Sequence, residues 1–147
     1  MINAATITTA IVTALEGHSA LSALSPTITR ADTLEDAVTV SPWIGVFKTE
    51  VEYDPRTLGR NPTQWEARIT CRVIAQVVSL FTGEDAEDTL EAIVQAIMDA
   101  LTNDHTLATQ VDILVRATVT YLMAPDDPQG QYSQAADILL IWEVSTS

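Results

Sequence analysis

Cysteine and basic residues are scarce in this chain of 147 residues. Cys71 is the only cysteine, which excludes an intrachain disulfide and a zinc site made entirely of cysteines. We therefore expect a reducing compartment. Only 7 Lys and Arg residues accompany 20 Asp and Glu residues, so the net charge is −13. Because proteins bind phosphate backbones through basic contacts, this charge disfavours a nucleic-acid-binding surface.

Long apolar runs and the common catalytic motifs are also missing. No stretch approaches the ~18 apolar residues of a membrane span, and the first basic residue is Arg30, so the N-terminus lacks the positive region of a secretory signal. We expect a soluble intracellular product with no membrane partner. The phosphate-binding loop, the dinucleotide-binding glycine motif, the serine-hydrolase elbow and the zincin motif are absent. These absences argue against the common enzyme classes.

The chain does have enough apolar material for a core. Apolar residues make up 47% of it and charged residues 18%, which is the composition of a folded protein. A length of 147 residues corresponds to one domain. We predict a single domain over residues 1–147.

Two segments have the apolar spacing of helices. In residues 3–16 the apolar side chains recur every three or four positions, and Gly17 follows where a left-handed C-cap is usually found. The second helix is expected to begin at Thr82-Gly83-Glu84-Asp85, where a capping oxygen and several acids suit a helix N-terminus. Its core-facing stripe is Leu90, Ile93, Val94, Ile97, Met98 and Leu101.

Four segments instead alternate with the period of two that is typical of strands, within residues 37–53, 65–81, 111–123 and 136–144. In the first, we place Trp43, Gly45, Phe47, Val51 and Tyr53 on the buried side. A strand over residues 65–81 would reach ~55 Å, longer than most strands, so a bulge bends it or its hairpin projects. The intervening loop holds two prolines and a glycine, together with Arg56 and Arg60.

The order α-β-β-α-β-β predicts an α+β domain in which two helices cover one face of a mostly antiparallel, four-stranded sheet. The other face would mix charges of both signs with a few apolar residues. Its polar members are Lys48, Glu50, Glu52, Glu66, Arg68, Thr70, Arg72, Arg116, Thr118, Thr120, Asp137 and Glu143, and its apolar ones are Leu80, Leu114, Leu122, Leu139 and Ile141. Such a face is either plainly solvated or a subunit interface. The candidate protein-contact residues are Arg56, Arg60, Lys48, Glu50, Arg68, Arg72 and Arg116.

No catalytic, cofactor or metal site is predicted. His18 and His105 lie near helix ends, where imidazole commonly meets free carbonyls. Asp104 is adjacent to His105 in sequence, and neighbours on a helix do not face each other. Cys71 falls on the apolar side of its strand and should be a buried, inert thiol.

One pattern of residues resembles a known family. It comprises Asp99-Ala100-Leu101, His105-Thr106-Leu107, Val111-Asp112, Tyr121, Gly130-Gln131-Tyr132 and Ala136-Asp137-Ile138. With the element order and the long first hairpin, it resembles the tail terminator (tail completion) proteins of long-tailed bacteriophages over nearly the whole chain. The match is one of layout and loose pattern, without a catalytic motif. One departure is Ala108-Thr109, where relatives often have glycine.

The resemblance implies a structural role in the virion tail or neck, after assembly in the host cytoplasm. The expected form is a hexameric ring on the head-proximal end of the tail tube, which contacts the tube protein, stops tube growth and offers a docking surface to the head connector. Genomic DNA would pass through without specific binding, which suits an acidic wall. On this reading Arg56 and Arg60 contact the adjacent protomer or the tube.

Three alternatives stay open from the sequence. A head-completion or tail-adaptor ring protein shares the small α+β layout. A small enzyme or ligand-binding module would have a pocket with convergent polar groups between helices and sheet. A monomeric adaptor would offer an exposed sheet edge for strand pairing.

Overall fold

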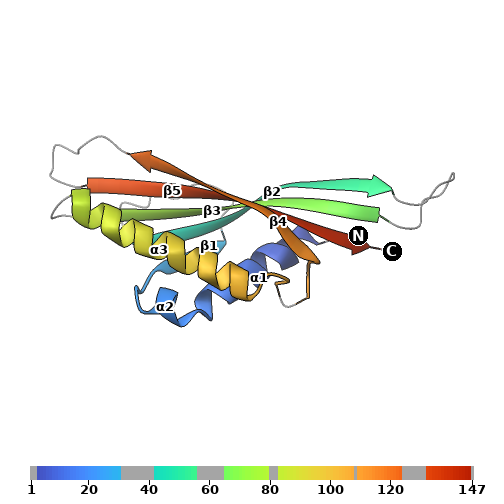
Figure 1. The fold of residues 1–147 in the computed structure, drawn as a ribbon, viewed down its shortest axis with the longest axis horizontal. Coiled ribbons are helices and arrows are strands. Elements are labelled where there is room, and N and C mark those ends of the chain that lie inside the picture. The colour runs from blue at the N-terminus through green and yellow to red at the C-terminus, as the bar shows by residue number, and fades with distance from the viewer. Residues whose placement is uncertain are drawn as a thin grey trace.

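In the described part of the chain, three helices lie on one face of a five-stranded, twisted sheet (Figure 1). The structure is a computed structural model, and it describes residues 3–30, 42–55, 65–79, 83–107, 109–123 and 132–146. The α+β class is confirmed. Among the described residues, no helix combines the length and the apolar character that crossing a membrane requires.

The first helix, α1 (Ala4–Glu16), forms where the sequence predicts it. The Asn3 side chain caps it by accepting a hydrogen bond from the Ala5 amide at 3.0 Å, and its buried stripe includes Ile11 and Leu15. The expected left-handed cap at Gly17 is wrong, because this residue has φ −80° and ψ −6°. A right-handed backbone there leads directly into the short helix α2 (Ser19–Ser22), which the two-helix prediction did not count.

The expected four-stranded sheet gains a fifth strand, β1 (Thr27–Arg30), which pairs parallel with β2 (Trp43–Pro55). The sequence did not predict β1, because a segment of four residues is too short to establish a period of two. Arg30 joins β1 to α1 by donating to the Ala5 carbonyl at 3.2 Å and to Thr9 Oγ1 at 2.6 Å.

The two longest strands, β3 (Trp65–Ser79) and β5 (Tyr132–Thr146), pair in the middle of the sheet, whose order is β1-β2-β3-β5-β4. The predicted alternation is confirmed in both. Core-facing members include Ile69, Cys71 and Val73 on β3 and Ile138 and Trp142 on β5, each with 0% of its surface exposed. The β2–β3 hairpin does project beyond the helices (Figure 1), and the register shift lies in β2, not in β3.

A β-bulge between Lys48 and Glu50 reverses which residues of β2 face the core. Beyond the bulge Val51 lies opposite Ile69, as predicted. Before it the predicted face is wrong, although Trp43 and Gly45 are buried, as expected. Ile44 and Val46 lie opposite core residues, whereas the residues that the sequence placed inside, Trp43, Gly45 and Phe47, lie opposite Gln76, Ile74 and Arg72 on the other face.

A second bulge, between Leu114 and Arg116, does the same in β4 (Ile113–Met123). Leu114, which we expected on the outer face, lies opposite Trp142 and packs against the core. Each bulge inserts one residue, and one residue is enough to exchange the two faces of a strand.

The helix α3 (Gly83–Asn103) covers the central strands β3 and β5. Its predicted stripe is confirmed, with Ile93 and Ile97 fully buried. The turn after it holds two left-handed residues, Leu107 at φ 48° and Thr109 at φ 73°. Thr109 is the second residue of Ala108-Thr109, the position at which the proteins that this sequence resembles often have glycine. A positive φ is the conformation that glycine adopts most easily.

Candidate subunit interface

The face of the sheet opposite the helices, which we call the open face, is uncovered by any helix of the described residues (Figure 1). Its members follow from the strand register, because they alternate with core residues. They include Trp43, Gly45, Phe47, Glu50, Glu52, Asp54, Glu66, Arg68, Thr70, Arg72, Ile74, Ile113, Arg116, Thr118, Thr120, Leu122, Asp137, Leu139, Ile141 and Glu143. The open face therefore carries most of the predicted mixed-charge residues.

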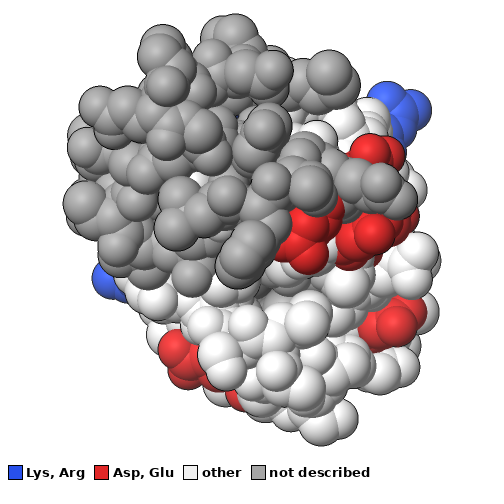
Figure 2. Space-filling view, turned by 90° about the vertical axis from the view of Figure 1, so that its left-hand side faces the viewer, with Lys and Arg blue, Asp and Glu red and all other residues white. Residues whose placement is uncertain are grey.

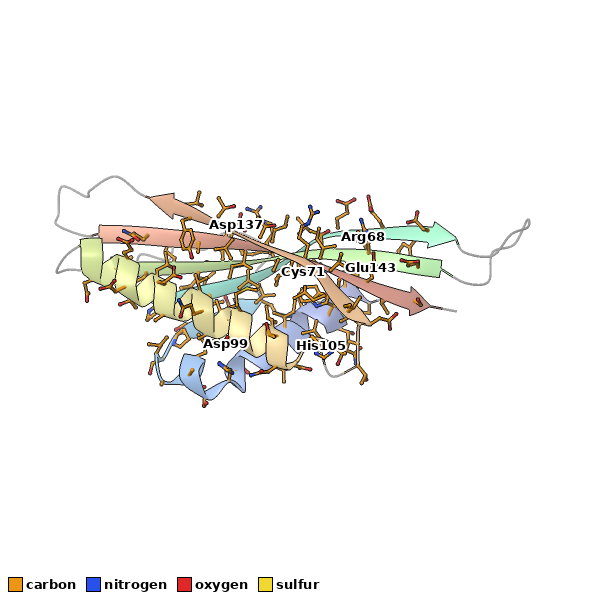
Figure 3. All side chains as sticks on the ribbon, in the orientation of Figure 1. Arg68, Cys71, Asp99, His105, Asp137 and Glu143 are labelled. Carbon is orange, nitrogen blue, oxygen red and sulfur yellow. The ribbon has the colours of Figure 1, made fainter. Side chains whose placement is uncertain are left out.

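Two ion pairs link β3 to β5 across the open face. Arg68 lies directly opposite Glu143, and its Nη2 atom is 2.8 Å from Glu143 Oε1. Arg72 reaches Asp137 diagonally with two hydrogen bonds, one of them from Nε to Oδ1 at 3.2 Å and the other from Nη2 to Oδ2. In each pair the hydrogen bond to the carboxylate is the main reason that the arginine pKa is raised. Figure 3 labels Arg68, Glu143 and Asp137 along the central strands.

These pairs change what the predicted contact residues can offer to a partner. The charges of Arg68 and Arg72 are already matched within the chain, so they form a neutral strip on the open face. Exposed pairs of this kind stabilise a fold weakly, by roughly 0–1 kcal/mol each in general.

The remaining predicted contact residues are scattered. Glu50 is exposed on the open face opposite Thr70, as expected, and Arg116 is exposed there opposite Ile141. Lys48 is exposed too, but its register partner is the core-facing Cys71, so the prediction that it shares a face with Glu50 is wrong because of the bulge. Arg56 and Arg60 lie outside the described residues.

An apolar cluster occupies the end of the open face nearest β1. Trp43 and Phe47 meet edge to face there, with ring centroids 6.5 Å apart and planes at 72°. Gly45 lies between them, where its missing side chain leaves room for the indole ring. Ile74 and Leu139 continue the apolar area on the neighbouring strands and are half-buried. Trp43 is only 3% exposed and Gly45 is buried, so the apolar surface available to a partner comes from the half-buried Phe47, Ile74 and Leu139. Apolar residues beside charges are typical of the core and rim of an association surface.

The edge strand β4 is the feature that sequence reasoning missed. It exposes four large apolar side chains, Ile113, Val115, Tyr121 and Leu122, at 53%, 47%, 52% and 52%. Three of them were predicted to be buried on the basis of alternation. Tyr121, on the helix side, is exposed because α3 packs on β3 and β5 and stops short of β4, whereas Ile113 and Leu122 lie on the open face. No pattern in the sequence reports how far a helix extends sideways over a sheet.

A cavity of about 250 Å³ opens between α3 and the end of β4. Its lining residues are Glu87, Leu90, Glu91, Tyr121, Leu122, Gln134 and Ala135. The Tyr121 hydroxyl donates to Glu91 Oε2 at 2.7 Å, and this bond is the main reason that the pKa of Tyr121 is raised. Figure 2 views the end of the molecule at which α3 begins, and the charges visible there are mainly acidic. The cavity therefore suits a cationic group with an apolar stem.

The residues considered for chemistry are not brought together. Cys71 is fully buried, and burial raises the pKa of its thiol from 9.0 to about 12. His18 precedes α2, and His105 is exposed after α3 (Figure 3). Within the described ranges, His, Cys, Asp and Glu form no group of three or more that could hold a metal ion.

Comparison with known proteins places the fold. No protein-family model matches the sequence, and no curated protein matches it. A chain of a solved structure, the virion of a native gene transfer agent (GTA) particle, is similar with a TM-score of 0.61 at 14% identity. The match covers 95% of this chain and 94% of that chain. The two chains therefore share one fold over nearly their whole length.

Proposed function

We propose that this chain is a structural protein of a virion, which assembles into a ring and closes the head-proximal end of a phage tail tube. The observation that carries the proposal is the fold shared with a chain of the GTA virion over 95% of the sequence. The terminator role within a particle draws on the sequence pattern that resembles tail terminators. Tail or neck is the corresponding location, after assembly in the host cytoplasm.

The surface of the chain supports assembly with other copies. A ring of identical protomers needs two different patches that fit each other head to tail. The open face, with half-buried Ile74, Leu139 and Ile141 beside its ion pairs, and the exposed strand β4 are two such patches in the described residues. A ring of about six protomers is the closed form that we expect.

The charge of the chain suits a passage for DNA. At −13, the chain repels phosphate at long range, so DNA could slide through the ring without being held. The proposed partners are the tail tube protein on one side of the ring and the head connector on the other. The role needs no turnover and no cofactor.

The first experiment measures mass by light scattering over a concentration series, with negative-stain images of the same fractions. A closed ring with a central hole supports the proposal. A chain that stays monomeric at every concentration and also fails to bind the ends of purified tail tubes contradicts it.

A second experiment separates the terminator role from that of a head-completion or tail-adaptor protein. The chain is added to tail tube protein during polymerisation, and tube lengths are measured with bovine serum albumin as the matched control. A terminator shortens the tubes and decorates one end of each. A ring that binds isolated connectors and leaves tube length unchanged transfers the assignment to the head-completion or adaptor class.

A further inference from the structure

The strand β4 is an unprotected sheet edge. It pairs with β5 on one side, and on its other side no strand of the described residues adjoins it. Natural proteins usually protect such edges with charges, prolines or a covering element. Over its described side chains β4 carries one charge, Arg116, and four half-exposed apolar residues. An edge of this kind is suited to accept another strand.

The opposite side of the sheet offers a strand of matching length. β1 covers β2 only from Trp43 to Val46, so residues 47–55 form a second free edge among the described strands. The pairs β2–β3, β3–β5 and β5–β4 are all antiparallel, so β4 runs opposite to β2. When a second copy is placed beside the first with its sheet continuing in the same sense, its β2 meets β4 as an antiparallel partner.

The charges on the helix side of the two edges are complementary. Lys48 has the register of a core-facing residue, and so does Tyr121, whose partner is Ala136. Glu87 and Glu91 lie beside Tyr121 around the cavity. The Lys48 side chain is exposed and has no hydrogen bond or ion pair with any other described residue. The cavity thus presents carboxylates where an incoming Lys48 side chain would lie.

We propose that β4 of one copy pairs with residues 47–55 of a second copy, and that Lys48 of the second copy enters the cavity at Glu87 and Glu91. This inference rests on the proposed ring, because a contact between two different edges continues from copy to copy until it closes. The occupant of the β4 edge is therefore this same chain.

One alignment of residues 47–55 with β4 gives favourable side-chain pairs on both faces of the sheet. With Lys48 opposite Tyr121, and the bulge counted, Val51 falls opposite Val119 on the helix side. On the open face Asp54 then falls opposite Arg116, an exposed cation that has no partner in the described residues. Apolar residues meet on one side and opposite charges on the other, as favourable cross-strand pairs require.

Disulfide trapping tests this register. Glu52 and Thr118 are both exposed on the open face and lie directly opposite each other across the proposed contact. Within one chain Glu52 on β2 and Thr118 on β4 are separated by the two strands β3 and β5. At ~4.8 Å between neighbouring strands, β2 and β4 are about 14 Å apart, which is too far for a disulfide. The native Cys71 is buried and does not compete.

We expect oxidised Glu52→Cys/Thr118→Cys protein to give a ladder that ends at the closed ring. A mixture of the two single variants should stop at dimers, and each single variant alone should stay monomeric on a denaturing gel. The control Glu52→Cys/Asp99→Cys places its second thiol toward the other end of α3 and should not cross-link (Figure 3). Absence of the ladder overturns the inference, and so does an equally strong ladder from the Glu52→Cys/Asp99→Cys control, because the cross-link would then not depend on the proposed register.

Charge reversal tests the cavity separately. Lys48→Glu and Glu87→Lys should each raise the protein concentration needed for assembly by at least about tenfold, because each sets like charges against each other. The double variant should recover most of the loss. Asp99→Lys makes the same charge change elsewhere on α3 and should assemble like the wild type.

The outcomes separate this inference from the proposed function. Wild-type rings that cap tail tubes, together with unaffected Lys48→Glu rings and no cross-linked ladder, overturn the contact and leave the terminator proposal standing. Glu52→Cys/Thr118→Cys protein that cross-links into rings, together with wild-type rings that ignore tube ends, supports the contact and removes the terminator role. Circular dichroism spectra must match across the variants for either conclusion.

Discussion

Gly45 is the residue on which the outer side of β2 depends most closely. A Cβ atom at this position would lie 2.7 Å from Trp43 Cζ2 and 3.0 Å from Phe47 Cε2, inside van der Waals contact. Trp43 is only 3% exposed, so its rigid ring has little freedom to move aside. Glycine is needed here for space between two rings, which the alternation placed on the same side of the strand as Gly45 but on the wrong face of the sheet.

We therefore predict that Gly45→Ala lowers the free energy of unfolding by about 1–3 kcal/mol, as overpacking usually does. Urea unfolding followed by tryptophan fluorescence measures the loss. In a Trp43→Leu background the same substitution should cost clearly less, because the obstructing ring is gone. Equal costs in the two backgrounds would show that the indole is not the obstacle.

Cys71 leads to a prediction about pH. Its pKa is about 12 in the folded chain and near the ordinary 9.0 when unfolded. Between these values the unfolded thiol loses its proton while the folded thiol keeps it, so rising pH favours unfolding. Below pH 9 the buried thiol's contribution to stability is fully retained. Above pH 9 the free energy of unfolding should fall by about 1.4 kcal/mol per pH unit.

Urea unfolding at several pH values from 8 upward tests this slope against Cys71→Ala, which lacks the thiol. The stability difference between wild type and variant should shrink as pH rises. Parallel curves would contradict the assignment. Native protein should also fail to react with a thiol reagent at pH 8 and should react once it is denatured.

At the scale of elements, α3 holds the helix layer on the sheet through a fully buried stripe. We predict that Ile97→Ala, at a side chain with 0% exposure, lowers the free energy of unfolding by about 2–5 kcal/mol. Gln95→Ala on the exposed side of the same helix should change it by less than about 0.5 kcal/mol. Urea midpoints of both variants make the comparison, and similar losses would mean that α3 is not packed as described.

The elements also show how far sequence reasoning reached. Helix α3 and the strands β3 and β5 were predicted because each keeps one period over many residues. The β2 and β4 faces were partly wrong because each strand contains a bulge, and a bulge leaves no mark on an alternating pattern when both faces are apolar, as in Trp43 to Phe47. Short β1 lacked enough residues to show any period.

At the scale of the whole molecule, charge dominates the behaviour toward nucleic acid. With a net charge of −13, the chain should not retard double-stranded DNA in a gel even at low salt, where electrostatic binding is strongest. A salt-sensitive shift would contradict the proposed non-binding channel. A basic DNA-binding protein run alongside verifies that the assay detects binding.

The candidate interface could be predicted only in part, because some of its contacts join strands that are far apart in the chain. The sequence identified a mixed-charge sheet face, and the structure confirms that Arg68, Arg72, Asp137 and Glu143 lie on it. That the arginines are matched by those two carboxylates depends on pairing between strands far apart in the chain. Such pairing is a property of the register, and one strand read alone does not reveal its partner.

The sequence by itself determined the α+β class, the central strands, the main helix, the inert position of Cys71 and the acidic surface, because these follow from local periodicity and composition. Only the tertiary structure decided which faces the bulges exchange, where α3 ends sideways on the sheet, and which strand edges stay free, those of β4 and of part of β2. These features arise because burial depends on what packs against a residue, and non-local packing is not encoded in any short stretch of the chain.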